Sequence, residues 1–212
     1  MVHGVRGLEA GRKAALLVSE VQNGIADPAY DDTPLARQVV TRGIVSKIND
    51  LAARFRSAGL PVIFCTIAAP SAGWSHFTVN CALAASLRRD GRLVDGTEHA
   101  ALHHDLIVSP ADVISHRHHG MAPFTGTGLD ATLRRYGIDT IVLCGVSTNI
   151  ALQGAATEAV ALGYNVVLAE DCTAGGTAET HRIQVTMHLP LLATISESAS
   201  IARSLGGQEA AS

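Results

Sequence analysis

Apolar residues follow two patterns that alternate along the chain. Short, nearly continuous apolar runs are typical of strands covered on both faces of a parallel sheet. Longer segments repeat apolar residues every three or four positions, as one face of a helix does. The runs predict strands at residues 14–21, 61–67, 111–116, 139–145, 165–171 and 193–196. The repeats predict helices at residues 36–58, 129–136 and 180–188, and a helix of small residues from about residue 151.

Strands separated by helices predict an α/β fold: a three-layer α-β-α arrangement around a mainly parallel, six-stranded, Rossmann-like sheet. In such sheets, ligands bind at the carboxyl ends of the strands. The candidate site therefore draws on the residues that end or follow five of the predicted strands. These are residues 19–23, 67–70, 115–124, 145–149 and 170–174.

Length and charge limit the possible functions. The 212 residues predict one domain over residues 1–205, followed by a flexible tail over residues 206–212. A formal net charge of -3, spread along the chain, gives no basic surface for nucleic acid or an anionic membrane. No apolar run is long enough to span a bilayer, and the first residues lack an apolar signal core. We expect a cytoplasmic protein whose partner is a small molecule, with neither nucleic acid nor membrane as a partner.

Cysteine and histidine give weak signals. The four cysteines, Cys65, Cys81, Cys144 and Cys172, lack CxxC spacing and are interpreted as reduced thiols rather than disulfide or metal partners. The run "HRHH" at 116–119 could bind a metal, but no fixed set of acidic or cysteine partners accompanies it. The stretch "HAALHHD" at 99–105 predicts a solvated loop or helix face. No metal or cofactor is expected.

Two stretches carry a family resemblance. "AALLVSEVQNGI" and "HHGMAPFTGTGLDATLRRYGIDTIVLCGVSTNIALQGAATEAVALGYNVVLAEDCTAG" resemble the first strand and the second half of the isochorismatase-like hydrolases. The likeness covers most of residues 14–196 in order and spacing. Residues 68–108 match poorly, and in this family that region helps to shape the substrate pocket. The resemblance also implies a homodimer or homotetramer, in agreement with the small-residue helix.

The catalytic residues of the family have changed here. Amidase members of the family use a Cys nucleophile, an Asp base and a Lys. The Asp position is Glu20 and the Cys position is Ala151, while the Lys position is His118 by its distance from Phe124, or His116 if the local gap differs. Alanine cannot form an acyl-enzyme, and nucleophilic catalysis of this kind needs an activated thiol. Cys144 precedes the turn and is a poor substitute.

The family contains a second solution. Isochorismatases proper also lack the Cys and hydrolyse a vinyl ether, and their acidic residue protonates the substrate. The resemblance implies that Glu20 could act in this way, provided that burial at the strand end keeps it partly protonated. The true isochorismatases carry a Tyr-Ala-His turn where this chain has Ser147-Thr148-Asn149. This difference makes isochorismate itself a doubtful substrate.

The turn after residue 145 is the second candidate feature. Gly145 allows a close approach of backbone to ligand, and a helix cap among Ser147, Thr148 and Asn149 would leave N–H donors facing the pocket. The family implies a cis peptide bond between Val146 and Ser147. The alternative is that this turn merely connects two elements of the fold. The predicted substrate-binding residues are Gln22, Phe124, Gly145, Val146, Ser147, Asn149 and Ala151.

Two functions of different class remain open. The first is a hydrolase without a cysteine nucleophile, in which Glu20 and a histidine at 118 or 116 perform acid–base chemistry on a small metabolite. The second is an inactive relative that binds a small molecule or serves as an oligomeric partner. Two alternatives apply to single residues. Glu20 could pair structurally with His118 or Arg117, and Gln22 could simply form the turn that ends its strand.

Overall fold

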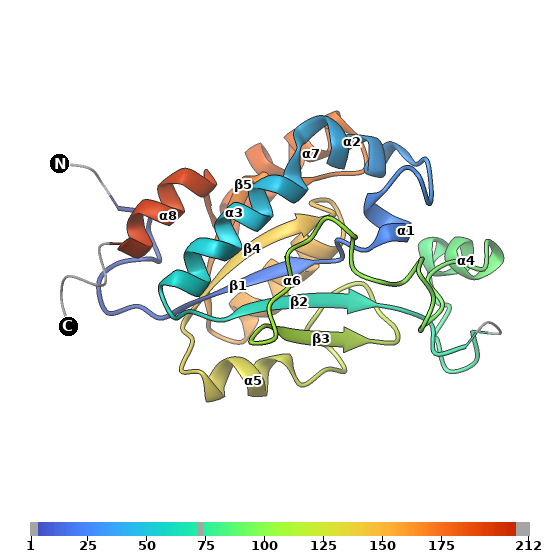
Figure 1. Ribbon diagram of the computed structural model, residues 1–212, viewed down its shortest axis with the longest axis horizontal. Helices are drawn as coiled ribbons and strands as arrows, with labels where there is room; N and C mark the ends of the chain where they lie inside the picture. The colour runs from blue at the N-terminus through green and yellow to red at the C-terminus, as the bar shows by residue number, and fades with distance from the viewer. Residues whose placement is uncertain (1–3, 72–73, 207–212) are drawn as a thin grey trace.

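Six strands form one sheet, in which every neighbouring pair is parallel, in the order β3-β2-β1-β4-β5-β6 (Figure 1). The computed structural model describes residues 4–71 and 74–206. The predicted α/β fold with a six-stranded sheet is thus confirmed. The strands are β1 (Ala14–Ser19), β2 (Val62–Ile67), β3 (Val113–Arg117), β4 (Thr140–Val146), β5 (Asn165–Ala174) and β6 (Thr194–Ser196).

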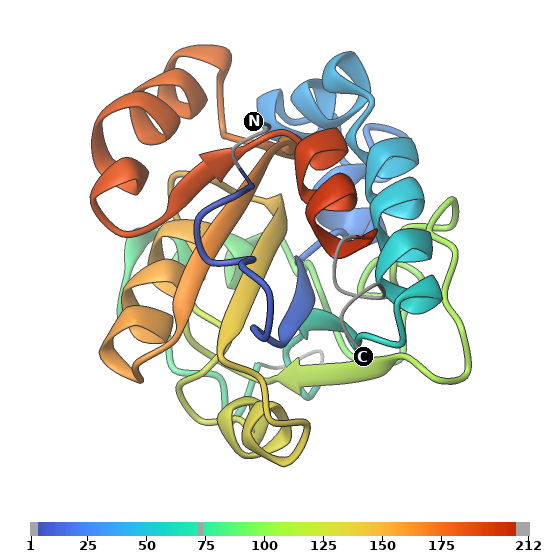
Figure 2. The same ribbon diagram turned by 90° about the vertical axis from the view of Figure 1, so that its left-hand side faces the viewer.

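The two faces of the sheet are covered by separate helical layers (Figure 2). Successive side chains of a strand point to opposite faces, so Leu16 and Val18 of β1 join one core while Ala15 and Leu17 join the other. The first core includes α3 (Ile44–Ser57) and α8 (Ser198–Gly206), with α1 (Asn23–Ala26) and α2 (Pro34–Arg42) beside them. The second includes α5 (Leu129–Arg135) and α6 (Ala151–Ala161).

The chain beyond β5 forms several short helical segments. Helix α7 (Ala178–Ile183) begins with a capping box in which the Thr177 hydroxyl accepts from the backbone N–H of Thr180. It continues into the π-helical segment η1 (Gln184–His188) and the 3-10 segment η2 (Leu189–Leu191). The helix predicted at residues 180–188 therefore exists, but it changes its hydrogen-bond pattern along its length.

Several boundaries differ from the sequence-based expectation. The single helix expected over residues 36–58 is two helices, because Gly43 takes a φ of 60° and ends α2. Both helices bury their apolar faces in the same core, so the apolar repeat continues across the break. Helices α4 (Ala82–Arg89) and α8 were not predicted. Helix α4 is only eight residues long and buries a single residue, Ala84, so its apolar face is too short to stand out in the sequence.

The predicted flexible tail and the predicted lack of a membrane span concern the chain as a whole. Residues 207–212 of the expected tail lie outside the described residues. Within 4–71 and 74–206, the helices are all too short or too polar to cross a bilayer.

Candidate functional site

A cavity of about 230 Å³ opens at the carboxyl ends of four neighbouring strands. Glu20 follows β1, Ile67 ends β2, Arg117 ends β3 and Ser147 follows β4, and all four line the cavity. Ligands of parallel sheets bind at this edge. The cavity therefore lies where the sequence predicted a ligand site. The other lining residues are mainly apolar: Ile25, Thr33, Leu35, Leu83, Leu87, Arg92, Leu93, Gly120, Met121 and Ile150.

Glu20 and Arg117 form an ion pair inside the cavity, with Nη2 of Arg117 donating to Oε1 of Glu20. The Arg117 side chain is only 3% exposed and that of Glu20 is 14% exposed. Glu20 takes the left-handed backbone conformation, with a φ of 52°. Among the described residues, neither Nε nor Nη1 of Arg117 has a hydrogen-bond partner. Two buried donors of the guanidinium are therefore unsatisfied in this part of the chain.

Neither predicted histidine lines this cavity. The Nδ1 atom of His116 lies 2.8 Å from the Thr66 hydroxyl, and Nδ1 of His118 lies 3.1 Å from the Ala68 carbonyl. Residues 116 and 118 share one side of the strand and its extension, whereas Arg117 points to the other side. Contrary to the expectation, the structure thus gives Glu20 a guanidinium as its neighbour. The expected alternative, a pairing of Glu20 with Arg117, is the one observed.

The turn after β4 uses several of its own donors. The Val146–Ser147 peptide bond is cis, as the resemblance implied. The Ser147 carbonyl accepts from the N–H groups of Ile150 and Leu152, and the N–H of Thr148 donates to Ala174. Ile150 is the N-cap of α6 and makes no side-chain cap, so the expectation of a cap among residues 147–149 is wrong. Ser147 itself lines the cavity.

Gly145 and Gln22 serve the backbone. A Cβ atom on Gly145 would lie 2.3 Å from the Ser19 carbonyl oxygen, so this glycine permits the contact of β4 with β1 and does not line the cavity. The buried amide of Gln22 accepts from the N–H of Ile67 and donates to the carbonyls of Ile67 and Ala100. These bonds occupy the amide, which supports the alternative that Gln22 forms the turn after its strand and does not bind substrate.

The remaining predicted substrate-binding residues do not line the cavity. Phe124 packs in the core beside Tyr164. Asn149 accepts from the N–H of Gly176 and so ties the turn to the end of β5. Val146 and Ala151 are buried, and Ala151 is the first residue of α6. A family motif read on the sequence places these residues near the strand ends, but it does not tell which of them face a ligand.

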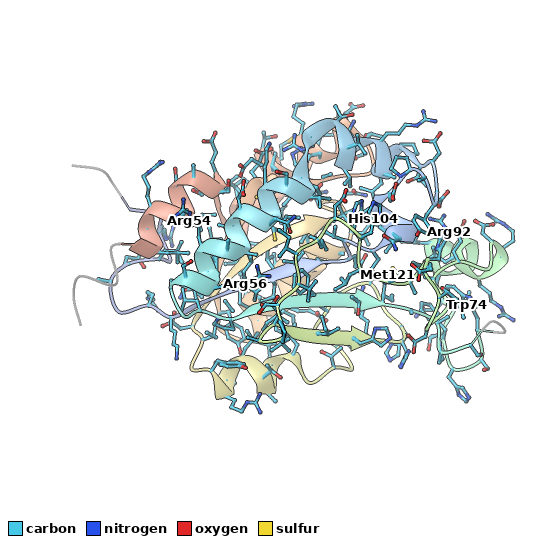
Figure 3. All side chains as sticks on the ribbon, viewed as in Figure 1. Arg54, Arg56, Trp74, Arg92, His104 and Met121 are labelled. Carbon is cyan, nitrogen blue, oxygen red and sulfur yellow. The ribbon has the colours of Figure 1, made fainter. Side chains whose placement is uncertain are left out.

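The segment over residues 68–108 supplies much of the cavity wall. Leu83 and Leu87 come from α4, while Arg92 and Leu93 follow it. Figure 3 shows Arg92 together with Met121 at this end of the molecule. The resemblance implied that this region shapes the pocket, but the sequence did not single out its residues, because α4 is only eight residues long. Arg117 was missed as a site residue because two histidines flank it, although its place at a strand end was a usable signal.

Three of the four cysteines are buried. Burial raises the pKa of Cys65 to about 12 and that of Cys172 to about 12, and it also raises the pKa of Cys144. The Cys144 thiol donates to the Leu17 carbonyl at 3.5 Å. Cys81 is exposed at the start of α4 and does not line the cavity. A thiolate is the reactive form of cysteine, so none of the buried thiols is activated.

Two groups of side chains in the described part of the chain could hold a metal ion. One consists of Asp95, His116 and His118. The other consists of Asp27, His103 and His104. His103 is 7% exposed, so the stretch 99–105, predicted as a solvated loop or helix face, includes one buried residue.

A larger hollow of about 480 Å³ lies between α3 and α8. Asp50, Arg54 and Arg203 are among its lining residues. Figure 3 shows Arg54 at the opposite end of the molecule from Arg92. This groove lies far from the carboxyl ends of the strands, and none of its charged residues forms a described ion pair there. The cavity at Glu20 remains the candidate site.

Comparison with known proteins agrees with this geometry. The Isochorismatase domain model matches residues 14–200. The chain is 34% identical over 193 residues to the uncharacterized isochorismatase family protein YecD of Escherichia coli O157:H7, covering 87% of this chain and 92% of that protein. It is 27% identical over 207 residues to the ureidoacrylate amidohydrolase RutB of Methylobacterium radiotolerans, covering 90% of this chain and 79% of the relative.

The fold has a close counterpart among solved structures. A cysteine hydrolase from Pseudomonas syringae pv. phaseolicola superposes with a TM-score of 0.82 and 21% identity, over 98% of this chain and 100% of that one. The parallel sheet, the cavity at its carboxyl edge and the match over residues 14–200 lead to one conclusion. The chain belongs to the isochorismatase family of hydrolases.

Proposed function

We propose that the protein hydrolyses a small carboxylate-bearing metabolite of the vinyl-ether type, with Glu20 as the acid–base group and no cysteine nucleophile. One observation carries this proposal: a buried Arg117 lies beside Glu20 in the cavity with two unpartnered donors. A buried donor without a partner costs about 1–3 kcal/mol. A ligand that supplies an acceptor removes this cost, which favours an anionic substrate.

Arg117 is the proposed carboxylate-binding residue. A guanidinium offers its donors in a planar fork that matches two carboxylate oxygens. Both two-donor edges of the guanidinium, Nε with Nη2 and Nη1 with Nη2, include the Nη2 atom that Glu20 occupies. A carboxylate that binds through two oxygens therefore takes Nη2 from Glu20 and also gives a partner to Nε or Nη1, which have none among the described residues. Part of the donor array of the turn is already bonded within the protein, through the N–H groups of Thr148, Ile150 and Leu152, so we propose Arg117 as the main contact of the carboxylate.

Glu20 is the proposed acid–base group. In vinyl-ether hydrolysis, the acid gives its proton to the terminal carbon of the double bond and leaves an oxocarbenium ion. Water then adds to this ion and returns a proton to the carboxylate, and the hemiketal breaks into an alcohol and a ketone. Only a protonated carboxyl can begin this sequence. In our proposal, the substrate carboxylate takes over Arg117 and releases Glu20 from the ion pair, so that Glu20 can take up a proton.

The surroundings of the cavity support chemistry without cysteine. Ala151 stands where the resemblance places a nucleophile, and it has no reactive side chain. Cys65, Cys144 and Cys172 are buried, with their thiol pKa values raised by burial. The apolar wall of α4 and its neighbours limits water at the reacting centre and suits a substrate with an apolar body.

The test is pyruvate release from isochorismate and related enol-ether carboxylates, with Glu20→Gln measured beside the parent. Arg54→Gln, an exposed residue of the distant groove, is the matched control. We expect turnover by the parent and the control, and at least about a hundredfold loss in Glu20→Gln. Retention of activity by Glu20→Gln would show that Glu20 is not the acid.

The second candidate function is binding without catalysis. The observation that favours it is the direct pairing of Glu20 with Arg117, because such a pair occupies the Glu20 carboxyl until a ligand separates the two. In this case, no enol ether is hydrolysed by any form of the protein. Small carboxylates nevertheless bind to the cavity in equilibrium measurements, and the binding depends on Arg117.

We also propose that the protein is a homodimer or homotetramer. Several large apolar side chains are exposed on and around α6 and the segment after α7: Ile150, Val160, Leu162, Met187 and Leu191. Exposed apolar side chains of this kind favour a protein–protein contact. Light scattering coupled to gel filtration measures the mass directly, and a monomer at micromolar concentration would contradict the proposal.

A further inference from the structure

Asp95, His116 and His118 come together from two segments of the chain. His116 lies in β3, His118 follows it, and Asp95 lies in the loop after α4. One ligand atom from each residue lies within 4.8 Å of the others. Asp95 is brought there by the isolated bridge between Ala69 and Val94, and its N–H donates to the Ala69 carbonyl. The acidic partner that the sequence did not reveal is thus supplied by the fold.

The hydrogen bonds of both histidines leave the Nε2 atoms for a ligand. Nδ1 of His118 donates to the Ala68 carbonyl at 3.1 Å, because a carbonyl can only accept. Nδ1 of His116 lies 2.8 Å from the hydroxyl of Thr66, which can accept in the same way. His116 Nε2 is buried and has no partner among the described residues. Histidines that bind metals usually have their second ring nitrogen held in this manner.

The second histidine group lacks this preparation. The N–H of Asp105 donates to Nδ1 of His103 at 3.2 Å, so the proton of the neutral ring is on Nε2. A protonated ring nitrogen cannot bind a metal. His104 is 58% exposed in its side chain and contacts two carboxylates at 3.5 and 3.6 Å. The hydrogen bonds of the ring nitrogens therefore favour metal binding by Asp95, His116 and His118.

We propose that Asp95, His116 and His118 bind one divalent transition-metal ion, with Zn²⁺ as the fitting probe. Two imidazole nitrogens and one carboxylate oxygen suit Zn²⁺, with water as the fourth ligand of a tetrahedral site. Neither histidine lines the Glu20–Arg117 cavity, so this site is separate from the proposed hydrolytic one. The ion would join the edge strand β3 to the loop that carries Arg92 and Leu93 of the cavity wall.

The test uses the untagged full-length protein, stripped with a chelator and then titrated with Zn²⁺ by calorimetry. We expect one ion per chain. Removal of a second-shell group costs about 10–100-fold in affinity, and we expect His118→Ala, which removes a ligand, to weaken binding by at least about a hundredfold. His119→Ala is the matched control, because its ring lies beside Gly126 in the same histidine run. His103→Ala tests the second group.

Two further readouts keep the outcomes distinct. Co²⁺ should give the visible absorption of a four-coordinate site in the parent and in His119→Ala, and lose it in His118→Ala. Zn²⁺ should raise the Tm of the parent, of His119→Ala and of His103→Ala, and leave that of His118→Ala unchanged. The exposed position of His118 makes folding of the variant straightforward to confirm by circular dichroism. Absence of stoichiometric binding, or equal binding by His118→Ala, would overturn the proposal, and loss confined to His103→Ala would assign the ion to the second group.

Discussion

Glu20 and Arg117 form an ion pair between β1 and β3, two strands that are not neighbours in the sheet. Strand β2 lies between them, and Arg117 reaches over its end, where Ile67 is its register partner. The pair therefore spans the carboxyl end of β2, and both of its residues line the cavity. An anion that enters the cavity must therefore compete with Glu20 for Arg117.

Removal of the Glu20 charge should strengthen carboxylate binding. In the free protein, Glu20 occupies one arm of Arg117, and a ligand carboxylate must compete with it. Glu20→Gln removes this competition, so we expect benzoate to bind about tenfold more tightly, as for one charge-assisted hydrogen bond. Calorimetric titration of parent and variant measures the change. An unchanged or weaker affinity would show that Glu20 does not compete with the ligand for Arg117.

Removal of the Arg117 charge should have the opposite effect. Loss of one member of a buried charged pair costs about 2–5 kcal/mol in binding, so Arg117→Gln should weaken benzoate binding at least tenfold. Arg117→Lys keeps the charge but lacks the planar fork, and it should lie between the parent and Arg117→Gln. The same titration with Arg54→Gln serves as the control for loss of a positive charge. Parent-like binding by Arg117→Gln would locate the anion elsewhere.

Only one cysteine should react in the native protein. Cys81 is exposed, whereas Cys65, Cys144 and Cys172 are buried and have raised thiol pKa values. Because the thiolate is the reactive form, Ellman's reagent should label one thiol per chain at pH 8 and four after unfolding. Cys81→Ser should abolish the native reaction. Loss of hydrolytic activity when Cys81→Ser is treated with the reagent would implicate a buried cysteine after all.

A side chain at Gly145 should destabilise the sheet. The new Cβ would lie 2.3 Å from the Ser19 carbonyl oxygen, and the φ of 94° is unfavourable for any residue but glycine. Gly163 has a φ of 88° with no atom near the place of its missing Cβ, so Gly163→Ala measures the conformational cost alone, about 1–2 kcal/mol. Urea unfolding should show a clearly larger loss for Gly145→Ala. Equal losses would mean that the two strands separate without cost.

The stability of the protein should fall as the pH drops below about 6.5, in part through His181. Burial lowers the pKa of His181 from its usual 6.5, in spite of the hydrogen bond to the Glu170 carboxylate, and the charge of Arg42 adds to the lowering. The unfolded chain then binds more protons than the folded one below pH 6.5, so stability is present above this pH and is lost below it.

The measurement is the free energy of unfolding at pH 7.5 and pH 5.5 for the parent and His181→Gln. Other histidines with lowered pKa values, such as His99 and His103, contribute to both proteins. The difference between the two therefore isolates His181, and the variant should lose less stability on acidification. An equal loss in both would show that His181 titrates alike in the folded and unfolded chains.

The apolar pattern of the sequence was sufficient to predict the strands and the α/β class. Continuous apolar runs such as residues 139–145 occur because both faces of the sheet are covered. Helix boundaries were less predictable. The apolar repeat continues through Gly43 because α2 and α3 share one core, and α4 is only eight residues long.

The sequence by itself determined the fold class, the family resemblance, the edge of the sheet where a ligand binds, and the presence of Glu20 at that edge. Only the tertiary structure decided which neighbouring side chains face the cavity. A strand turns successive residues to opposite sides, so a shift of one position exchanges His116 and His118 for Arg117. The partners of these residues come from other segments, Glu20 on one side and Asp95 on the other. Such contacts depend on strand register and loop path, which no local pattern of residues specifies.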